Sequence, residues 1–170
     1  MCTTETWKPV PGYEGRYEVS DLGRVRSVDV RVAYNHWRSG ERLVRLKRGR
    51  QVATQHINSG YEIVHLHADN KRQAFLVHRL VAQVFLPPAD ATLDVNHKDG
   101  RKDNNAANNL EWLRRSANHD HAVDLGLNLR AIPVRCPKTG KSFPSISRAA
   151  RETGHCHKYV AENFERTTRT

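Results

Sequence analysis

The sequence predicts a small, modular α+β protein. Its 170 residues are only 38% hydrophobic, and so polar a composition favours small modules over one large core. Apolar and polar residues alternate along the first half of the chain, whereas helical spacing is confined to short later stretches. We therefore expect a β-rich module at residues 1–55, a central domain at 56–127 with a strand–loop–strand–helix core at about 93–126, and a helical module at 128–170.

The N-terminal module begins with a predicted hairpin. Between Tyr13 and Val28, apolar and polar residues alternate on either side of a Ser-Asp-Leu-Gly turn. Basic residues then dominate up to position 50 and are interleaved with aromatic residues and valines, which favours a strand-borne basic surface that faces phosphates over a merely solvated face. The candidate nucleic-acid contacts in this module are Arg24, Arg26, Arg45, Lys47, Arg48 and Arg50.

The central domain opens with two predicted strands and a helix. Residues 61–67 and 73–77 read as strands around a turn, and apolar residues from Leu80 onwards recur at helical spacing until Pro87 and Pro88 stop the helix. His78 lies where the second predicted strand ends and the helix begins. We expect it to serve local packing or capping.

The core of this domain lies in the stretch "LDVNHKDGRKDNNAANNLEWL". Residues 93–97 form an extended apolar segment that ends on His97, a polar loop follows at 98–108, and residues 109–113 form a second short strand. Five asparagines surround the single histidine, and amide side chains favour turns because they hydrogen-bond nearby backbone. Ser116 is expected to cap a helix that Gly126 ends.

The last module reads as a hairpin followed by two short helices. The hairpin turns at 138–140, Ser145 caps a helix that ends at Gly154, and a further helix runs from about His157 to Phe164. Two short helices separated by a glycine turn suggest a helix-turn-helix. Its candidate DNA contacts are Ser145, Ser147, Arg148 and Lys158.

The charge balance indicates a polyanionic partner. The chain has 28 Lys and Arg against 18 acidic residues, a net charge of +10, which favours nucleic acid over membrane because no basic amphipathic helix lies beside an aromatic-rich apolar face. The alternative is that the charge only keeps the protein soluble. We expect neither a signal peptide nor a membrane span, and the three unpaired-looking cysteines suggest a reducing, cytoplasmic setting.

Three stretches resemble parts of one family. "DVNHKDGRKDNNAANNLEWLRRSANHDHA" resembles the HNH motif, the ββα-metal finger of phage and intron homing endonucleases. "WKPVPGYEGRYEVSDLGRVRS" resembles an N-terminal module often fused to these nucleases, and "FPSISRAARETG" resembles their C-terminal helix-turn-helix module. The resemblance implies a phage- or intron-encoded endonuclease that hydrolyses phosphodiester bonds of double-stranded DNA in the cytoplasm of a bacterial host. It further implies a monomer or homodimer that takes no small-molecule substrate.

The resemblance also implies roles for individual residues. His97 would be the general base, because imidazole titrates near neutral pH, and Asn109 would bridge the loop backbone and fix the orientation of His97. Asn96 and Asn118 would bind a metal through amide oxygens, and oxygen donors alone favour Mg²⁺ or Mn²⁺. Further phosphate contacts would come from Lys98, Arg101 and Lys102.

Two departures from the family pattern bear on the metal. Many relatives carry Asp or His where this chain has Asn96, so metal affinity without DNA is expected to be low. Zinc-type relatives place a histidine where this chain has Ala122, which argues against tightly held zinc or nickel. Two alternatives stay open. The first is a non-catalytic, repressor-like DNA-binding protein with a degenerate finger. The second is an RNA-binding or RNA-cleaving protein, which the absence of an aromatic stacking platform disfavours.

Overall fold

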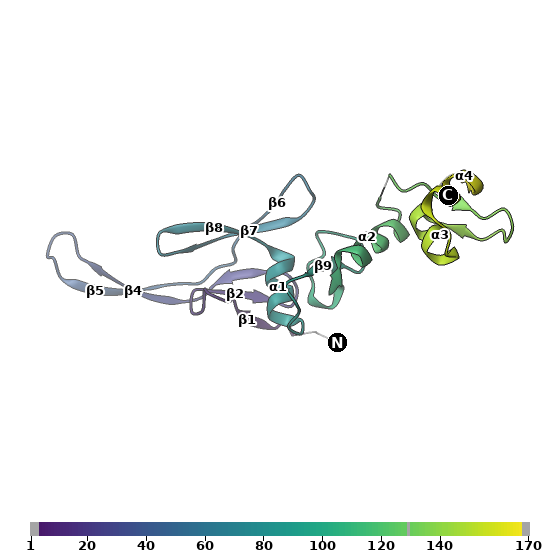
Figure 1. The fold of residues 1–170 in the computed structure, drawn as a ribbon. Helices are drawn as coiled ribbons and strands as arrows, with labels where there is room; N and C mark the ends of the chain where they lie inside the picture. Colours follow the sequence, from purple (N-terminus) through teal and green to yellow (C-terminus); the bar gives the residue numbers. More distant parts are fainter. Residues whose placement is uncertain (1–3, 129, 168–170) are drawn as a thin grey trace. The chain divides into compact units, whose positions relative to one another are not determined.

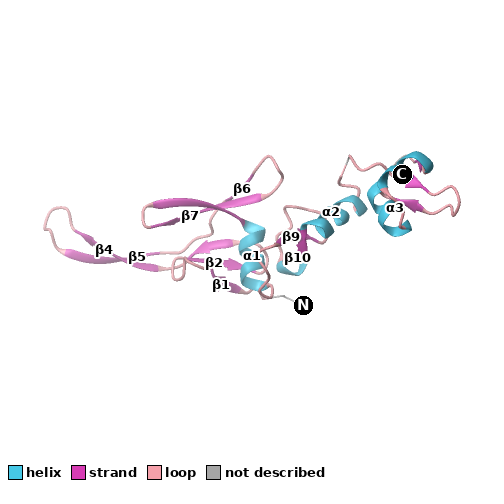
Figure 2. Ribbon diagram, viewed as in Figure 1, coloured by secondary structure: helices cyan, strands magenta, loops and turns pink. Residues whose placement is uncertain are grey.

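The computed structural model describes residues 4–128 and 130–167 and divides into two compact units, Met1–Trp112 and Leu113–Thr170 (Figure 1). Strands prevail in the first unit, and both units combine strands with helices (Figure 2). The predicted α+β class is therefore confirmed. Cys2 lies outside the described residues.

A three-stranded antiparallel sheet opens the first unit. It contains β1 (Trp7–Pro9), β2 (Tyr17–Ser20) and β3 (Val25–Ser27), in that order. The β2–β3 pair is the hairpin expected between Tyr13 and Val28, and Gly23 in its turn has a φ of +83°, a conformation that glycine adopts without steric cost. The sequence pattern did not predict β1.

Two further antiparallel arrangements follow. The strands β4 (Val30–Asn35) and β5 (Arg42–Lys47) form a two-stranded hairpin that carries many of the basic residues. A three-stranded sheet then contains β6 (Thr54–His56), β7 (Glu62–Ala68) and β8 (Lys71–Leu76), and helix α1 (Val77–Phe85) follows β8 directly. The predicted strand–turn–strand–helix order is confirmed, with the helix starting at Val77.

One hydrophobic core joins the parts of the first unit. Helix α1 turns an apolar face inward because Val77, Leu80 and Val81 recur at helical spacing. These side chains meet Val19 and Val25 of the first sheet, together with buried residues of β7, β9 and β10: Val64, Leu66, Val95 and Leu110. The strand that ends on the candidate base is thus anchored on a rigid core.

The predicted strand–loop–strand–helix core has the expected order. Strand β9 (Leu93–His97) pairs with β10 (Leu110–Arg114), a short 3₁₀ turn at Ala107–Asn109 precedes β10, and helix α2 (Arg115–Asp124) follows it. The prediction that Ser116 caps α2 is wrong. The N-cap is Arg114, which makes no side-chain cap hydrogen bond, because the strand continues to that residue before the backbone turns helical.

The second unit ends in a small α+β module with its own core. Strands β11 (Val134–Arg135), β12 (Ser142–Phe143) and β13 (Glu165–Arg166) form a sheet in the order β12-β11-β13, beside helices α3 (Ile146–Thr153) and α4 (His157–Asn163). Ser145 caps α3 as expected, because its Oγ accepts a hydrogen bond from Arg148 N at 3.1 Å. Within residues 4–128 and 130–167, no helix has the length and apolar character needed to cross a bilayer.

Candidate active site

Asn96 and His97 end strand β9, and both side chains are buried, with exposures of 5% and 4%. Neighbouring residues of a strand point to opposite faces, so the two side chains have different surroundings. The His97 ring lies 5.2 Å from the His78 ring and 6.1 Å from the Tyr61 ring, between centroids. Asn96 instead meets Glu111 of β10.

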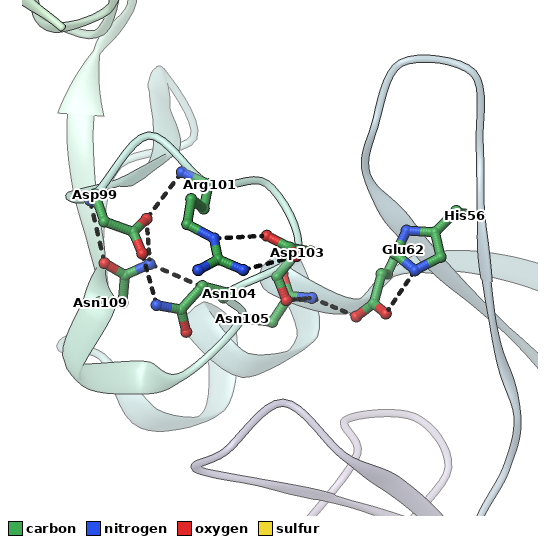
Figure 3. Close-up of polar contacts among 8 residues, drawn as sticks. All are labelled: His56, Glu62, Asp99, Arg101, Asp103, Asn104, Asn105 and Asn109. Atoms are coloured by element: carbon green, nitrogen blue, oxygen red, sulfur yellow. Dashed lines mark hydrogen bonds and ion pairs between the residues drawn. The ribbon is translucent and has the colours of Figure 1, made fainter.

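His97 is held by a hydrogen bond from the polar loop. Its Nε2 lies 3.3 Å from Asn105 Oδ1, and Asn105 Nδ2 donates to Glu62 Oε2 at 2.7 Å. Figure 3 shows Glu62 reaching from β7 to Asn105 in the loop. Asn105 is itself 3% exposed, so this contact lies in a dry setting where hydrogen bonds orient side chains strongly.

A second network closes the loop around Asp99 (Figure 3). Asn109 Oδ1 accepts from Asp99 N at 3.2 Å, while Asn109 Nδ2 donates to Asp99 Oδ1 and to Asn104 O at 3.0 and 2.8 Å. Hydrogen bonds from the Asn104 amide, the Arg101 backbone and the Asn109 amide lower the pKa of Asp99 to about 2. The Asn109 side chain thus bridges the loop backbone.

The orientation of Asn96 suits a metal ligand. Its Nδ2 donates to Glu111 Oε1 at 2.8 Å, and because a carboxylate only accepts, the amide oxygen must point away from Glu111. This oxygen accepts no hydrogen bond from any residue within 4–128 and 130–167. It is a hard donor of the kind that Mg²⁺ and Mn²⁺ prefer.

The donor chemistry gives no support for a thiolate or imidazole metal centre. In the part of the chain that the structure describes, no group of three or more His, Cys, Asp or Glu side chains could hold a metal ion. Asn118, the other predicted ligand, lies half-buried on α2 in the second unit. A hard ion that keeps most of its waters needs few protein ligands, so the amide oxygen of Asn96 fits one.

His78, expected to serve packing or capping, packs behind His97. It is 4% exposed on α1, and burial, with smaller contributions from the charges of His97 and Arg79, lowers its pKa to about 4. The N-cap of α1 is Leu76, so His78 does not cap the helix. A neutral imidazole therefore stands beside His97 at neutral pH.

Two family models match the chain. Residues 5–67 match the NUMOD4 motif, and residues 75–120 match the HNH endonuclease family. The DNA endonuclease I-HmuI of Bacillus phage SP01 is 32% identical over 162 residues, which covers 87% of this chain and 83% of that protein. The chain belongs to the HNH homing endonuclease family. Members of this family are generally dependent on divalent metal ions.

Further comparisons agree with this family. The H-N-H endonuclease F-TflII of Escherichia phage T5 is 27% identical over 150 residues, covering 85% of this chain and 65% of that protein. A solved structure described as DNA binding and cleavage by the HNH homing endonuclease I-HmuI matches with a TM-score of 0.56 and 28% identity, over 97% of this chain and 99% of that one. This HNH endonuclease therefore shares its fold along nearly its whole length with that nuclease.

Several basic residues predicted to contact DNA make intramolecular contacts in this HNH endonuclease. Arg24 binds Glu5, Arg26 binds Glu18 while stacking 4.2 Å from the Trp7 ring, and Arg48 lies 3.8 Å from Asp29. In the finger loop, Lys98, Arg101 and Lys102 bind Asn108 O, Asp103 and Ser59 O, respectively. In the second unit, Arg148 binds Glu152 and Lys158 lies 4.0 Å from Glu162.

The remaining predicted contacts are exposed or structural. Arg45, Lys47, Arg50 and Ser147 are exposed, whereas Ser145 is buried as the cap of α3. Exposed ion pairs are weak and can exchange for phosphate contacts. The paired arginines and lysines thus stay candidates for DNA binding.

Three polar residues of the site escaped the sequence analysis. Glu62 on β7 reaches Asn105, and Glu111 on β10 reaches Asn96, whereas Asn105 stood out in the sequence only as one of the five asparagines around His97. Alternation along residues 61–67 indicates which side chains share a face, but not what that face meets. No local sequence signal identifies these contacts.

Proposed function

We propose that this protein cleaves double-stranded DNA by hydrolysing phosphodiester bonds, with His97 as the general base and Asn96 and Asn118 as ligands of Mg²⁺ or Mn²⁺. The observation that carries the proposal is the buried pair Asn96–His97 at the end of β9 in a chain of the HNH family. The imidazole would take a proton from the attacking water. When bound, the cation would neutralise charge that develops on the phosphate oxygens.

Asn109 would support catalysis without touching the reacting atoms. Its side chain ties Asp99 and Asn104 together, and this keeps the loop after His97 in one conformation. Asn104 and Asn108 would also hold the loop. The side-chain amide of Asn104 donates to Asp99, and the backbone carbonyl of Asn108 accepts from Lys98. The loop thus holds the base in place while DNA and metal bind.

DNA binding would use basic residues of both units. Arg45, Lys47 and Arg50 offer exposed charge in the first unit, and α3–α4 would act as a helix-turn-helix in the second. One finger offers one active centre, so a monomer would nick one strand, and cutting both strands would need a homodimer or two sequential events. Like the phage proteins it resembles, the enzyme would act in the cytoplasm of a bacterial host, without a small-molecule substrate.

Plasmid cleavage tests the proposal. With Mg²⁺, wild-type protein should convert supercoiled plasmid to open circle, and His97→Ala should slow this by at least about 100-fold, the usual contribution of a general base, with DNA affinity retained. His67→Ala, at an exposed histidine on β7, is the matched control. Equal cleavage by wild type and His97→Ala would refute the assignment of the base. Binding without any nicking would instead support the repressor-like alternative, which endonuclease relatives do not favour.

A further inference from the structure

We propose that Glu62 and Asn105 are positioning residues that fix the tautomer of His97, so that its proton sits on Nε2 and its lone pair on Nδ1. This inference rests on the proposed role of His97 as the base. Glu62 lies on β7, outside the residues that match the HNH family model. The tautomer of the base would therefore be set by a strand upstream of the finger.

Glu62 is held from both sides. Its Oε1 lies 3.4 Å from Thr54 Oγ1 and from His56 Nε2, both on β6. Its Oε2 accepts from Asn105 Nδ2 at 2.7 Å, and Figure 3 shows Glu62 between His56 and Asn105. The Glu62 side chain is 18% exposed, so water competes little for the carboxylate. The strand pair β6–β7 thus presents a fixed acceptor to the loop.

This acceptor decides which way the Asn105 amide faces. Nδ2 meets two acceptors, Glu62 Oε2 at 2.7 Å and Asp103 O at 3.4 Å. A flipped amide would place Oδ1 against both of them, and neither can donate a hydrogen bond. Asn105 is 3% exposed, so no solvent would relieve that repulsion. Oδ1 therefore faces His97.

The amide oxygen in turn decides the tautomer. Oδ1 can only accept, so the 3.3 Å contact with His97 Nε2 is a hydrogen bond only when Nε2 carries the proton. The neutral ring then has its lone pair on Nδ1. In the opposite tautomer, Nδ1–H could not accept a proton from water, and two lone pairs would face each other at Asn105.

The lone pair on Nδ1 is accessible. Among the residues that the structure describes, the one buried side-chain nitrogen or oxygen without a partner is His78 Nδ1. If His97 Nδ1 were buried, it would therefore need a hydrogen-bond partner among those residues. It has none, so this nitrogen is exposed to solvent. The ring thus presents its proton acceptor to solvent from a 4% exposed side chain.

Histidine ¹⁵N shifts test the tautomer directly, without metal, DNA or turnover. Long-range ¹H–¹⁵N spectra of the full-length, metal-free protein at pH 8 distinguish a protonated Nε2 from a protonated Nδ1, and the His97 signals are those missing in His97→Gln. We expect the Nε2–H pattern in wild type. Asn105→Ala and Glu62→Ala should each give a mixture of tautomers. A wild-type Nδ1–H pattern, or no change in either variant, would overturn the proposal.

A double variant and a matched control separate orientation from loop damage. Combining Glu62→Gln with Asn105→Asp exchanges donor and acceptor in the pair but leaves an acceptor facing His97, so the Nε2–H pattern should return. Asn104→Ala removes an equally short amide–carboxylate bond, 2.7 Å to Asp99 in the same loop, without touching His97, and should keep the wild-type pattern. A mixture of tautomers in Asn104→Ala would mean that loop order alone sets the tautomer of His97. A double variant with the same mixture as the single variants would mean the same.

Single-turnover cleavage connects the tautomer to function. Glu62→Ala and Asn105→Ala should cut about 10- to 100-fold more slowly, as for other supporting residues, with DNA affinity unchanged and with recovery in the double variant. Altered tautomer patterns with full cleavage would refute the positioning role. If His97→Ala itself stays active while the spectra behave as expected, the proposed base fails but the tautomer assignment stands.

Discussion

Acid should destabilise the first unit through His78. Its pKa is about 4 in the folded protein against an ordinary value of 6.5, chiefly because burial disfavours the charged ring. Between these values the unfolded chain binds more protons than the folded one, so stability falls as pH drops from about 6.5 to about 4 and is unaffected by this group above that window. At about 1.4 kcal/mol per pKa unit, the difference amounts to about 3 kcal/mol.

Replacing the ring removes both the titration and a buried polar atom. His78→Phe should lose this pH dependence and be more stable at pH 7 by about 1 kcal/mol or more, because His78 Nδ1 has no partner. Urea unfolding followed by circular dichroism at pH 7 and pH 4.5 measures both effects. His78→Gln, which is polar but not titratable, should also lose the dependence, and His67→Phe at an exposed position should retain it. An equal loss of stability on acidification in wild type and both His78 variants would refute the reasoning.

Three further substitutions have expected outcomes. Gly23→Ala would place a Cβ 2.8 Å from Asn105 Cβ at a φ of +83°. It should therefore lower the free energy of unfolding by about 1–3 kcal/mol and slow plasmid nicking. Gly12→Ala, at a similar φ in open space, should leave nicking unchanged. Trp112→Phe removes the 3.1 Å bond from Nε1 to Pro87 O and should lower the urea-unfolding free energy by about 1 kcal/mol. Ser145→Ala should destabilise the C-terminal module by about 1 kcal/mol in thermal unfolding, and Ser147→Ala, at an exposed helix position, should not.

Local features of the sequence were enough to predict much of the fold. The β2–β3 hairpin, the order of β9, loop, β10 and α2, and the Ser145 and Gly154 ends of α3 all follow from patterns within a few residues. Such patterns are reliable because alternation, helical spacing and capping depend on neighbours in the chain. The motif spacing around His97 likewise identified the family that the comparisons confirm.

By itself, then, the sequence determined the class, the order of the elements around His97 and the candidate base. Only the tertiary structure decided what surrounds that base: the Glu62–Asn105 pair, the Glu111 partner of Asn96 and the buried ring of His78. It also decided that Ser116 is no cap and that many arginines are already paired. These contacts join residues far apart in the chain, and which strands and loops meet depends on how the whole core packs, a property that no local pattern encodes.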